Sequence, residues 1–378
     1  MRITDIKSYH PSDGTRNSIF VQVLTDEGIA GVGQPYTIGP DEGVLGVIQS
    51  ITPWFAGQDP SRIEWLMRRA RNNMRFPLGQ VAWSALSGIE MALWDIQGKA
   101  LGLPVYMLLG GRMRERVRLY HGIHGETPEK LAEEAQARVA EGYTGLKMFP
   151  CPGYASSPWG KVVRDSAARM EAVRRAVGDS IDIAVDIHTT VLEPARAREL
   201  VEAMEPYRLF FVEEPVRPDN ISTMARFREM VRVPVATGEN LYGVTMFNEL
   251  LDAEAVDIIQ PDLCVCGGLL EAKKICAAAE AHYVTVSPHN PLGLLSTAAA
   301  VHLAASTPNF IVLEYHGDHD KPKAAFVDDP WTPKGGWFEL PARPGLGMEL
   351  DLKAIAKHPT KPWGRGFPTH PDGAPAYI

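Results

Sequence analysis

The sequence has 378 residues but only four cysteines: Cys151, Cys264, Cys266 and Cys276. They are too few and too irregularly spaced for a disulfide framework in a chain of this length. Cys264 and Cys266 could suggest zinc, but no second cysteine or histidine pair stands at metal spacing. We therefore expect free thiols in a loop.

Long apolar runs and an excess of basic residues are also lacking. No apolar run is long enough to cross a bilayer, and the first residues alternate in polarity rather than forming the apolar core of a signal peptide. The net charge of −8 provides no basic surface for nucleic acid. We expect a cytoplasmic protein that binds neither nucleic acid nor membrane, and its length predicts two structural parts.

A regular pattern fills the second half of the chain. Short β-rich runs alternate with amphipathic helical stretches, at residues 117–121, 145–149, 181–186, 209–213, 235–237, 256–260, 284–287 and 310–314. Eight parallel strands joined by helices predict an α/β fold, a (β/α) barrel of the TIM type, whose active site lies at the carboxyl ends of the strands. Polar residues stand at these ends: Asp186, Glu213, Glu239, Asp262, His289 and Glu314.

The segments on either side of this pattern differ from it. Residues 1–115 predict an α+β unit, with strands in 2–10 and 18–33, a turn at 26–28, and helices near 42–51, 60–72 and 80–101. Its loops at 35–40 and 72–77, with 149–159 of the barrel, are expected to cover a pocket. Residues 116–320 are the barrel, and residues 321–378 are a tail returning to the first unit. The end of the tail, 361–378, is either an extended surface segment, which we favour, or an oligomer contact.

Three of the strand ends predict a metal site. Neighbouring strands lie about 4.8 Å apart, so Asp186, Glu213 and Glu239 converge on one small cation. A ligand set of carboxylate oxygens suits Mg²⁺. Any one of these residues alone would more often be a helix cap, and it is the set of three in register that favours a site. If residues 183–188 form a strand, His188 shares the face of Asp186.

Two further strand ends predict a general base. Asp262 and His289 end adjacent strands, and a carboxylate on one imidazole nitrogen raises the basicity of the other. Lys147 ends the second strand beside Asp186 and is expected to place a positive charge on the pocket wall. The alternative is a solvated lysine at the barrel rim.

Longer motifs carry a resemblance to a known family. They are the stretch from Ala85 to Lys99, Leu108-Leu109-Gly110-Gly111, Glu213-Glu214-Pro215, Gly238-Glu239-Asn240, Gln260-Pro261-Asp262-Leu263 and Gly267-Gly268. With them the chain resembles the enolase superfamily, in its mandelate racemase and muconate lactonizing branch. The resemblance implies a modified (β/α)7β barrel under an α+β capping domain built from both ends of the chain.

The resemblance also implies roles for single residues. The family's Mg²⁺ ligands fall on Asp186, Glu213 and Glu239, its His-Asp dyad on His289 and Asp262, and its electrophilic acid, expected to be protonated, on Glu314. Lys147 matches the first lysine of a Lys-x-Lys motif, but Phe149 replaces the second, which is the usual second base. Asp186-Ile187-His188 is similar to galactonate-dehydratase-like sugar-acid dehydratases, in which the histidine is the general acid. Thr189 and Thr190 depart from the Gly-Arg that often follows there.

These features predict a Mg²⁺-dependent lyase, a dehydratase of an aldonate-type sugar acid. His289 removes the proton at C2, and His188 protonates the leaving 3-hydroxyl to give a 2-keto-3-deoxy acid. The alternatives are a racemase, epimerase or cycloisomerase of such an acid, and a non-catalytic barrel that only binds it. We expect a homo-oligomer.

Overall fold

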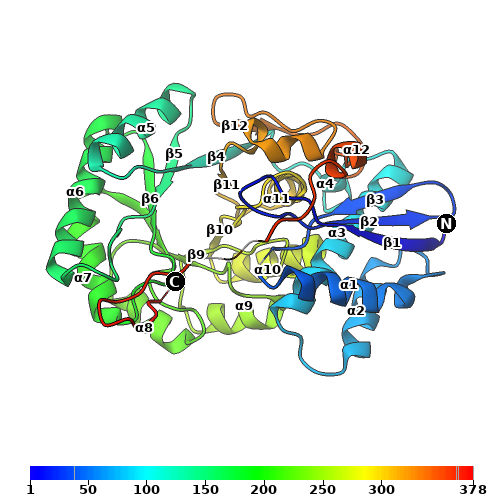
Figure 1. Cartoon of the computed structure of the whole chain (residues 1–378), viewed down its shortest axis with the longest axis horizontal. Coiled ribbons are helices and arrows are strands. Elements are labelled where there is room, and N and C mark those ends of the chain that lie inside the picture. The colour runs from blue at the N-terminus through cyan, green and yellow to red at the C-terminus, as the bar shows by residue number, and fades with distance from the viewer. Residues whose placement is uncertain (38, 363, 365, 378) are drawn as a thin grey trace.

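The computed structural model describes residues 1–37, 39–362, 364 and 366–377. The chain begins with an antiparallel sheet in the order β1 (Ile3–Tyr9), β2 (Phe20–Thr25) and β3 (Ala30–Gly33). The helices α1 (Asp41–Phe55), α2 (Ile63–Met74) and α3 (Gln80–Leu101) follow, and together these elements form the capping unit (Figure 1). The predicted turn joins β2 to β3, and its Gly28 has a positive φ of 80°.

The helix α3 lies against β3 at very close range. A Cβ at Gly33 would lie 2.0 Å from the carbonyl oxygen of Gly88, and one at Gly31 would lie 2.0 Å from that of Ala92. Glycine is required at these two positions because a Cβ on this face of β3 would displace the helix backbone. Neither α3 nor any other helix in the described part of the chain is long and apolar enough to cross a membrane.

A curled parallel sheet in the order β10-β9-β8-β7-β6-β5-β4-β11 forms the second unit. Its strands are β4 (Arg116–Ile123), β5 (Gly145–Met148), β6 (Asp182–Asp186), β7 (Leu209–Glu213), β8 (Val235–Thr237), β9 (Ile258–Ile259), β10 (Thr285–Val286) and β11 (Leu313–Tyr315). The ring closes because Val286 pairs with Phe310, just before β11.

Seven helices connect the eight barrel strands. They are α5 (Pro128–Ala140), α6 (Trp159–Val177), α7 (Pro194–Met204), α8 (Ile221–Met230), α9 (Gly243–Asp252), α10 (Gly268–Ala281) and α11 (Leu295–Ser306), while α4 (Val105–Leu108) leads into β4. The predicted fold class, a (β/α)7β barrel with an α+β cap, is confirmed.

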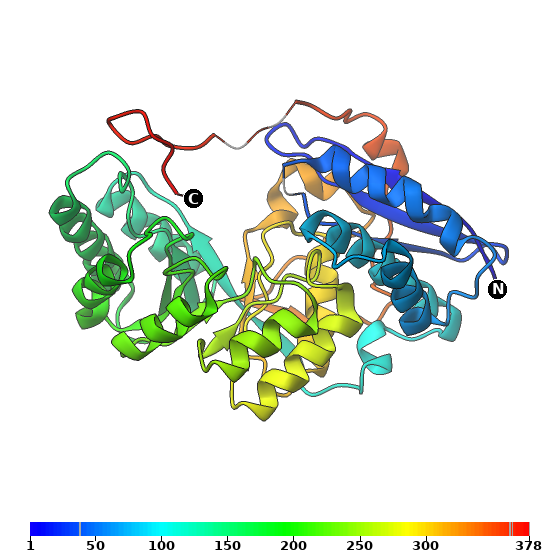
Figure 2. The same ribbon diagram turned by 90° about the horizontal axis from the view of Figure 1, so that it is seen from below.

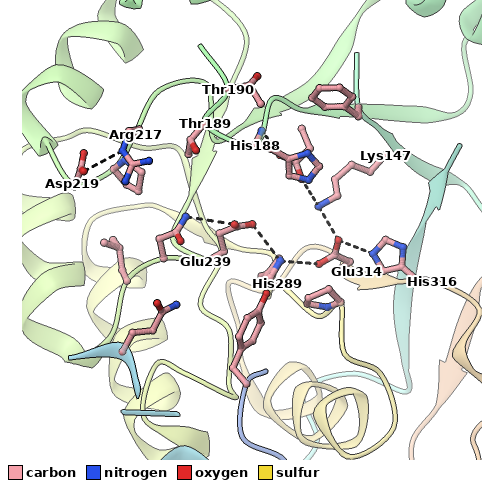
Figure 3. A pocket seen from close by; sticks show the side chains of 18 of the residues that line it. Lys147, His188, Thr189, Thr190, Arg217, Asp219, Glu239, His289, Glu314 and His316 are labelled. Atoms are coloured by element: carbon pink, nitrogen blue, oxygen red, sulfur yellow. Dashed lines mark hydrogen bonds and ion pairs between the residues drawn. The ribbon is translucent and has the colours of Figure 1, made fainter. Parts of the chain in front are cut away.

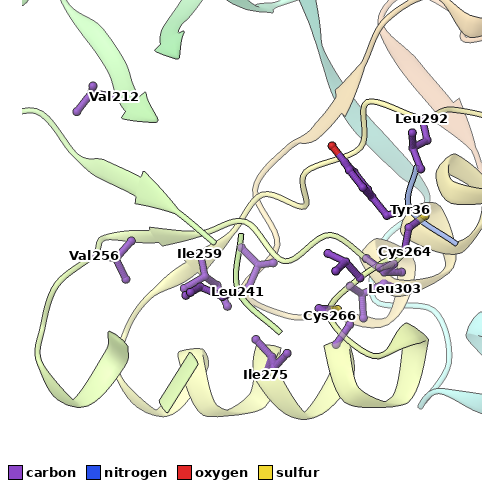
Figure 4. Close-up of a cluster of buried hydrophobic side chains, with 14 of the residues drawn as sticks. Tyr36, Val212, Leu241, Val256, Ile259, Cys264, Cys266, Ile275, Leu292 and Leu303 are labelled. Carbon is purple, nitrogen blue, oxygen red and sulfur yellow. The ribbon is translucent and has the colours of Figure 1, made fainter. Parts of the chain in front are cut away.

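A large apolar cluster fills the space between the barrel wall and its helices (Figure 4). Leu241, Ile259 and Ile275 are buried in it. Cys264 and Cys266 lie in the turn after β9, within the same cluster, and all four cysteines are buried and unpaired. The expected free thiols are confirmed, and they occupy core space.

The chain does not end with a barrel helix. After β11 it passes through short 3-10 turns at Asp318–Asp320 and Pro322–Phe326, then β12 (Trp337–Glu339) and α12 (Leu352–Ile355). β12 pairs antiparallel with β4, and the backbone N–H of Leu346 donates to Asp95 in α3 (2.7 Å). The last part, red in Figure 2, leaves the capping sheet and crosses to the barrel. Residues 363, 365 and 378 of this part, and residue 38 of the first predicted loop, lie outside the described residues.

Candidate active site

The side chains predicted from the strand ends meet at one rim of the barrel. Lys147 lies in β5, Asp186 ends β6, Glu213 ends β7, Glu239, Asp262 and His289 follow β8, β9 and β10, and Glu314 lies in β11. Asp186 and Glu213 are direct partners in the register of β6 and β7. Figure 3 shows several of these groups pointing into one cavity.

The predicted carboxylate triad is compact. One oxygen each of Asp186, Glu213 and Glu239 lies within 4.8 Å of the others. Asp186 and Glu213 are buried, and burial together with the charge of Asp186 raises the pKa of Glu213 to about 8. The Nζ of Lys147 is 3.2 Å from Asp186 Oδ2 and 2.8 Å from Glu213 Oε1. The raised pKa of Glu213 reflects the cost of burying several carboxylates together, a cost that a bound cation would relieve.

The donor set of the triad fits Mg²⁺. All three ligands are carboxylate oxygens, the hard donors that this ion prefers. Glu239 is 21% exposed, so the site opens toward the cavity and toward a substrate oxygen. Glu214 supports this ligand: its carboxylate accepts from the N–H of Gly238 (3.3 Å) and from Asn240 Nδ2 (3.3 Å), the two neighbours of Glu239.

His289 and Asp262 form a hydrogen-bonded pair, with 2.7 Å between Nδ1 and Oδ2. The other oxygen of Asp262 accepts from the N–H of Cys264 (2.7 Å), which fixes the carboxylate. His289 Nε2 faces the triad, 3.2 Å from Glu239 Oε2. Burial alone would lower the pKa of His289, but the charges of Glu239 and Glu314 raise this pKa well above its usual value. In its neutral form, with the ring proton on Nδ1, His289 presents Nε2 to the cavity as a proton acceptor.

His188 reaches the triad by a route that the sequence did not predict. β6 ends at Asp186, and His188 and Thr189 form a turn with positive φ values of 52° and 55°. The ring Nε2 of His188 lies 2.9 Å from Asp186 Oδ2, and its backbone N–H donates to Oδ1 (2.9 Å). The two side chains do meet, but the expected strand alternation is wrong here.

The surroundings of His188 favour its protonated form. Burial alone would lower the pKa of His188, but Asp186 raises it to about 9. The ring of Phe149 stacks on His188 with 5.5 Å between centroids and 26° between planes. Phe149 therefore replaces a second base and also holds the imidazole in place.

Glu314 differs from the protonated acid that we expected. It is buried, and it accepts from Lys147 Nζ (2.8 Å) and the N–H of Asn290 (2.7 Å), with His316 Nε2 at 3.0 Å. Burial raises its pKa, but the positive charges of Lys147 and His289 outweigh burial and hold the pKa well below its usual value. In this arrangement the neighbouring positive charges favour the ionised form of Glu314.

Two histidines that the sequence analysis missed complete this side of the cavity. The rings of His124 and His316 stack with 6.5 Å between centroids. A Cβ at Gly122 would lie 2.5 Å from the His316 ring, so glycine in β4 makes room for it. His316 follows Glu314 at the same carboxylate-x-histidine spacing that we noted at the end of β6. That spacing was the signal that could have identified it.

These groups line a cavity of about 940 Å³. Two of the predicted loops contribute Tyr36, Phe149 and Tyr154 to its wall, while the remaining wall includes residues that were not predicted: Arg16, Gln80, Arg217, Asp219 and Pro368. Residues 72–77 do not line it, and Gln80 at the start of α3 does so instead. The volume lies at the upper end of the range for small-molecule sites.

A barrel with three metal-type carboxylates, a His-Asp pair and a capping unit defines an enolase-type enzyme. Residues 130–354 match the family model "Enolase C-terminal domain-like", and residues 6–110 match the N-terminal domain of mandelate racemase / muconate lactonizing enzyme. The chain belongs to this family, as the sequence motifs predicted.

Several known proteins are similar to the chain over its full length. It is 33% identical to D-galactonate dehydratases from Ralstonia pickettii and Variovorax paradoxus, with 100% of each chain covered. Among solved structures, an enolase from Agrobacterium radiobacter, described as a candidate galactarate dehydratase and bound to sodium and L-malate, has a TM-score of 0.94, 38% identity and full coverage of both chains. A mandelate racemase/muconate lactonizing enzyme from Jannaschia has a TM-score of 0.90 and 34% identity, covering 97% and 99%. The predicted enzyme class, a hydro-lyase, is confirmed.

Proposed function

We propose that the protein is a Mg²⁺-dependent dehydratase of a sugar acid. It removes the proton at C2, expels the hydroxyl at C3 and releases a 2-keto-3-deoxy acid. The observation that carries this proposal is the placement of a paired proton acceptor, His289, and a proton donor, His188, against two different members of one carboxylate triad.

Asp186, Glu213 and Glu239 would hold the metal ion. When bound, Mg²⁺ supplies positive charge close to the substrate carboxylate, where negative charge develops as the C2 proton leaves. Lys147 lies beside the same oxygens and adds a fixed positive charge of the protein itself. These charges are preorganised because their carriers are buried and mutually paired.

His289 acts as the base in this proposal. In the neutral ring, Asp262 holds the proton on Nδ1, so the lone pair of Nε2 faces the cavity and accepts the C2 proton. The charge left on the substrate carboxylate lies near Lys147. Glu314 orients that lysine, with 2.8 Å between Nζ and Oε1.

His188 acts as the acid. Electrons return from the carboxylate to form the C2–C3 double bond, the C3–O bond breaks, and the proton on His188 goes to the departing oxygen. The enol that remains tautomerises to the 2-keto acid. The hydrophobic Phe149 beside His188 offers no amine to return a proton to C2, which favours elimination over epimerisation.

A substrate panel tests the proposal. The purified protein with Mg²⁺ is incubated with aldonic, aldaric and uronic acids, and 2-keto acids are detected as semicarbazones. Proton NMR in D₂O follows exchange at C2. We expect a 2-keto-3-deoxy product from at least one acid. Interconversion of C2 epimers with no keto acid would refute the dehydratase and support the racemase alternative.

A further inference from the structure

The final part of the chain joins the two walls of the cavity. We call the described residues from 358 to 377 the C-terminal strap. At its start, the carbonyl oxygen of His358 accepts from the N–H of Ser12 (3.2 Å), and that of Lys361 accepts from Asn17 Nδ2 (2.9 Å). These partners lie in the loop between β1 and β2, which also carries Arg16 to the cavity wall.

The far end of the strap is a small hairpin. Thr369 pairs antiparallel with Pro375, the N–H of His370 donates to Ala374 (2.8 Å), and the N–H of Ala376 donates to Pro368 (3.0 Å). These contacts close the hairpin.

This hairpin lies on the loop between β5 and α6. His370 Nδ1 is 3.0 Å from the carbonyl oxygen of Ala155, and the hydroxyl of Tyr154 donates to the backbone carbonyl oxygen of Tyr377 (2.5 Å). Figure 2 shows the red strap passing from the capping unit to the barrel. The strap therefore bridges the two units on the side where the cavity opens.

One strap residue, Pro368, reaches the cavity wall. Tyr154, which also lines the cavity and binds the strap at Tyr377, packs edge-on against Phe149 with 6.3 Å between centroids, and Phe149 stacks on His188. An aromatic layer thus leads from the strap to the proposed acid. In the proposed reaction His188 faces the C3 hydroxyl, so the carbon chain beyond C3 would extend past His188 toward this side of the cavity.

We infer that the strap determines substrate length. Pro368 and Tyr154 close the cavity around the far carbons of the sugar acid, and the loops that the strap joins hold this closure in place. The inference rests on the proposed function, because it takes the orientation of the substrate from His289 and His188. Pro368 lies on the cavity wall and has no part in the proposed proton transfers, so its substitution is expected to change selectivity for substrate length.

Two opposite substitutions test this. Pro368→Trp fills the far end of the cavity, and Pro368→Gly enlarges it. The matched control is Pro371→Trp, the same change at an exposed turn residue of the same hairpin that does not line the cavity. The kcat/KM of each protein is measured on acids of four to seven carbons that share the C2 and C3 configuration of the best substrate. For an acid that is not turned over, its inhibition constant against the best substrate is used.

We expect Pro368→Trp to lower the ratio of kcat/KM for the longest acids to kcat/KM for the shortest acids by at least ~10-fold. A loss of space for one methylene group in a tight pocket has an effect of this size. Pro368→Gly should raise this ratio, because the longest acids gain space. Pro371→Trp should give the same ratio as the wild type. Tyr154→Phe, which removes the bond to Tyr377, should broaden the range of lengths. The melting temperature of each variant shows that it is folded.

The outcomes separate this inference from the proposed function. If the wild type forms no keto acid from any acid of the series and the panel, the dehydratase is wrong. If the wild type is active and both Pro368 variants keep its length profile, the strap does not determine length and the inference alone is overturned. An equal change in the Pro371 control would also overturn it, because the effect would then belong to the hairpin as a whole.

Discussion

Replacing Asp262 with asparagine tests whether its carboxylate sets the tautomer of His289. In the native pair, Oδ2 accepts from Nδ1–H at 2.7 Å, and Oδ1 accepts from the N–H of Cys264 at 2.7 Å. The Cys264 N–H still needs an acceptor in the variant, so the amide oxygen takes the place of Oδ1. The amide nitrogen then faces Nδ1 and donates to it. This forces the ring proton onto Nε2, the atom that must accept the C2 proton.

The expected loss follows from this inversion. A general base contributes ~10²- to 10⁴-fold, and the wrong tautomer in a comparable His-Asp pair of serine proteases costs about 10⁴-fold in kcat. We therefore expect Asp262→Asn to lower kcat by ~10³- to 10⁴-fold. His289→Asn should cost about the same, and the double variant should cost no more than either, because both changes remove one function.

Two assays localise the defect. Keto acid formation and C2 deuterium exchange should fall together in Asp262→Asn, since proton removal itself is impaired. Asp219→Asn is the control, because it makes the same charge change at an exposed carboxylate of the same cavity that pairs with Arg217. Retention of more than about a tenth of the activity in Asp262→Asn, or additive losses in the double variant, would refute the assignment of a dyad.

Four other predictions address the metal, the acid and the stability of the fold. EDTA should abolish activity and Mg²⁺ restore it, and Glu239→Gln should weaken metal affinity by ~10-fold or more in a metal titration; full activity in metal-free buffer would contradict the site. His188→Asn should lower keto acid formation by ~10²- to 10⁴-fold while C2 exchange persists, and parallel loss of both would argue against its role as the acid. Gly33→Ala should destabilise the protein by about 3 kcal/mol in urea unfolding because its Cβ would meet a backbone oxygen, whereas Gly46→Ala in α1, with open space around it, should not. Burial lowers the pKa of His302 to about 4, so the unfolded chain binds the proton first as the pH falls below 6.5; roughly 2 kcal/mol of stability present above that pH should be lost by pH 5, and His302→Gln should remove this loss.

The strand ends of the barrel were predictable because the pattern repeats. Every strand-helix unit has a similar length, so a carboxylate or histidine after each apolar run falls on the same rim. The helix predicted near residues 80–101 is also observed, at Gln80–Leu101, since Gly102 and Pro104 mark its end. Both predictions rest on short stretches of sequence, and tertiary packing leaves the elements that these stretches favour unchanged.

The rest of the cavity depends on contacts that no local pattern records. Arg16 and Pro368 come from opposite ends of the chain, and only the folded path of the strap brings them to the same opening. The charge on Glu314 was also harder to predict, because it depends on Lys147 from β5 as well as on His316, which directly follows β11. The sequence shows which residue stands at each strand end, but the charge of that residue depends on the groups that the fold places around it.

The backbone next to the triad adopts left-handed conformations at three residues that are not glycine. His188, Thr189 and Glu214 all have positive φ values, of 52°, 55° and 44°. Each such residue costs of order 1–3 kcal/mol unless the surroundings compensate, and threonine is among the least suited because of its branched side chain. The N–H of Thr189 donates to the carbonyl oxygen of Glu214 (3.0 Å), so the strained turns hold each other in place. A relaxed strand would direct His188 by alternation alone. The strained turn instead brings both its ring and its N–H onto Asp186, which is the arrangement that the proposed acid requires.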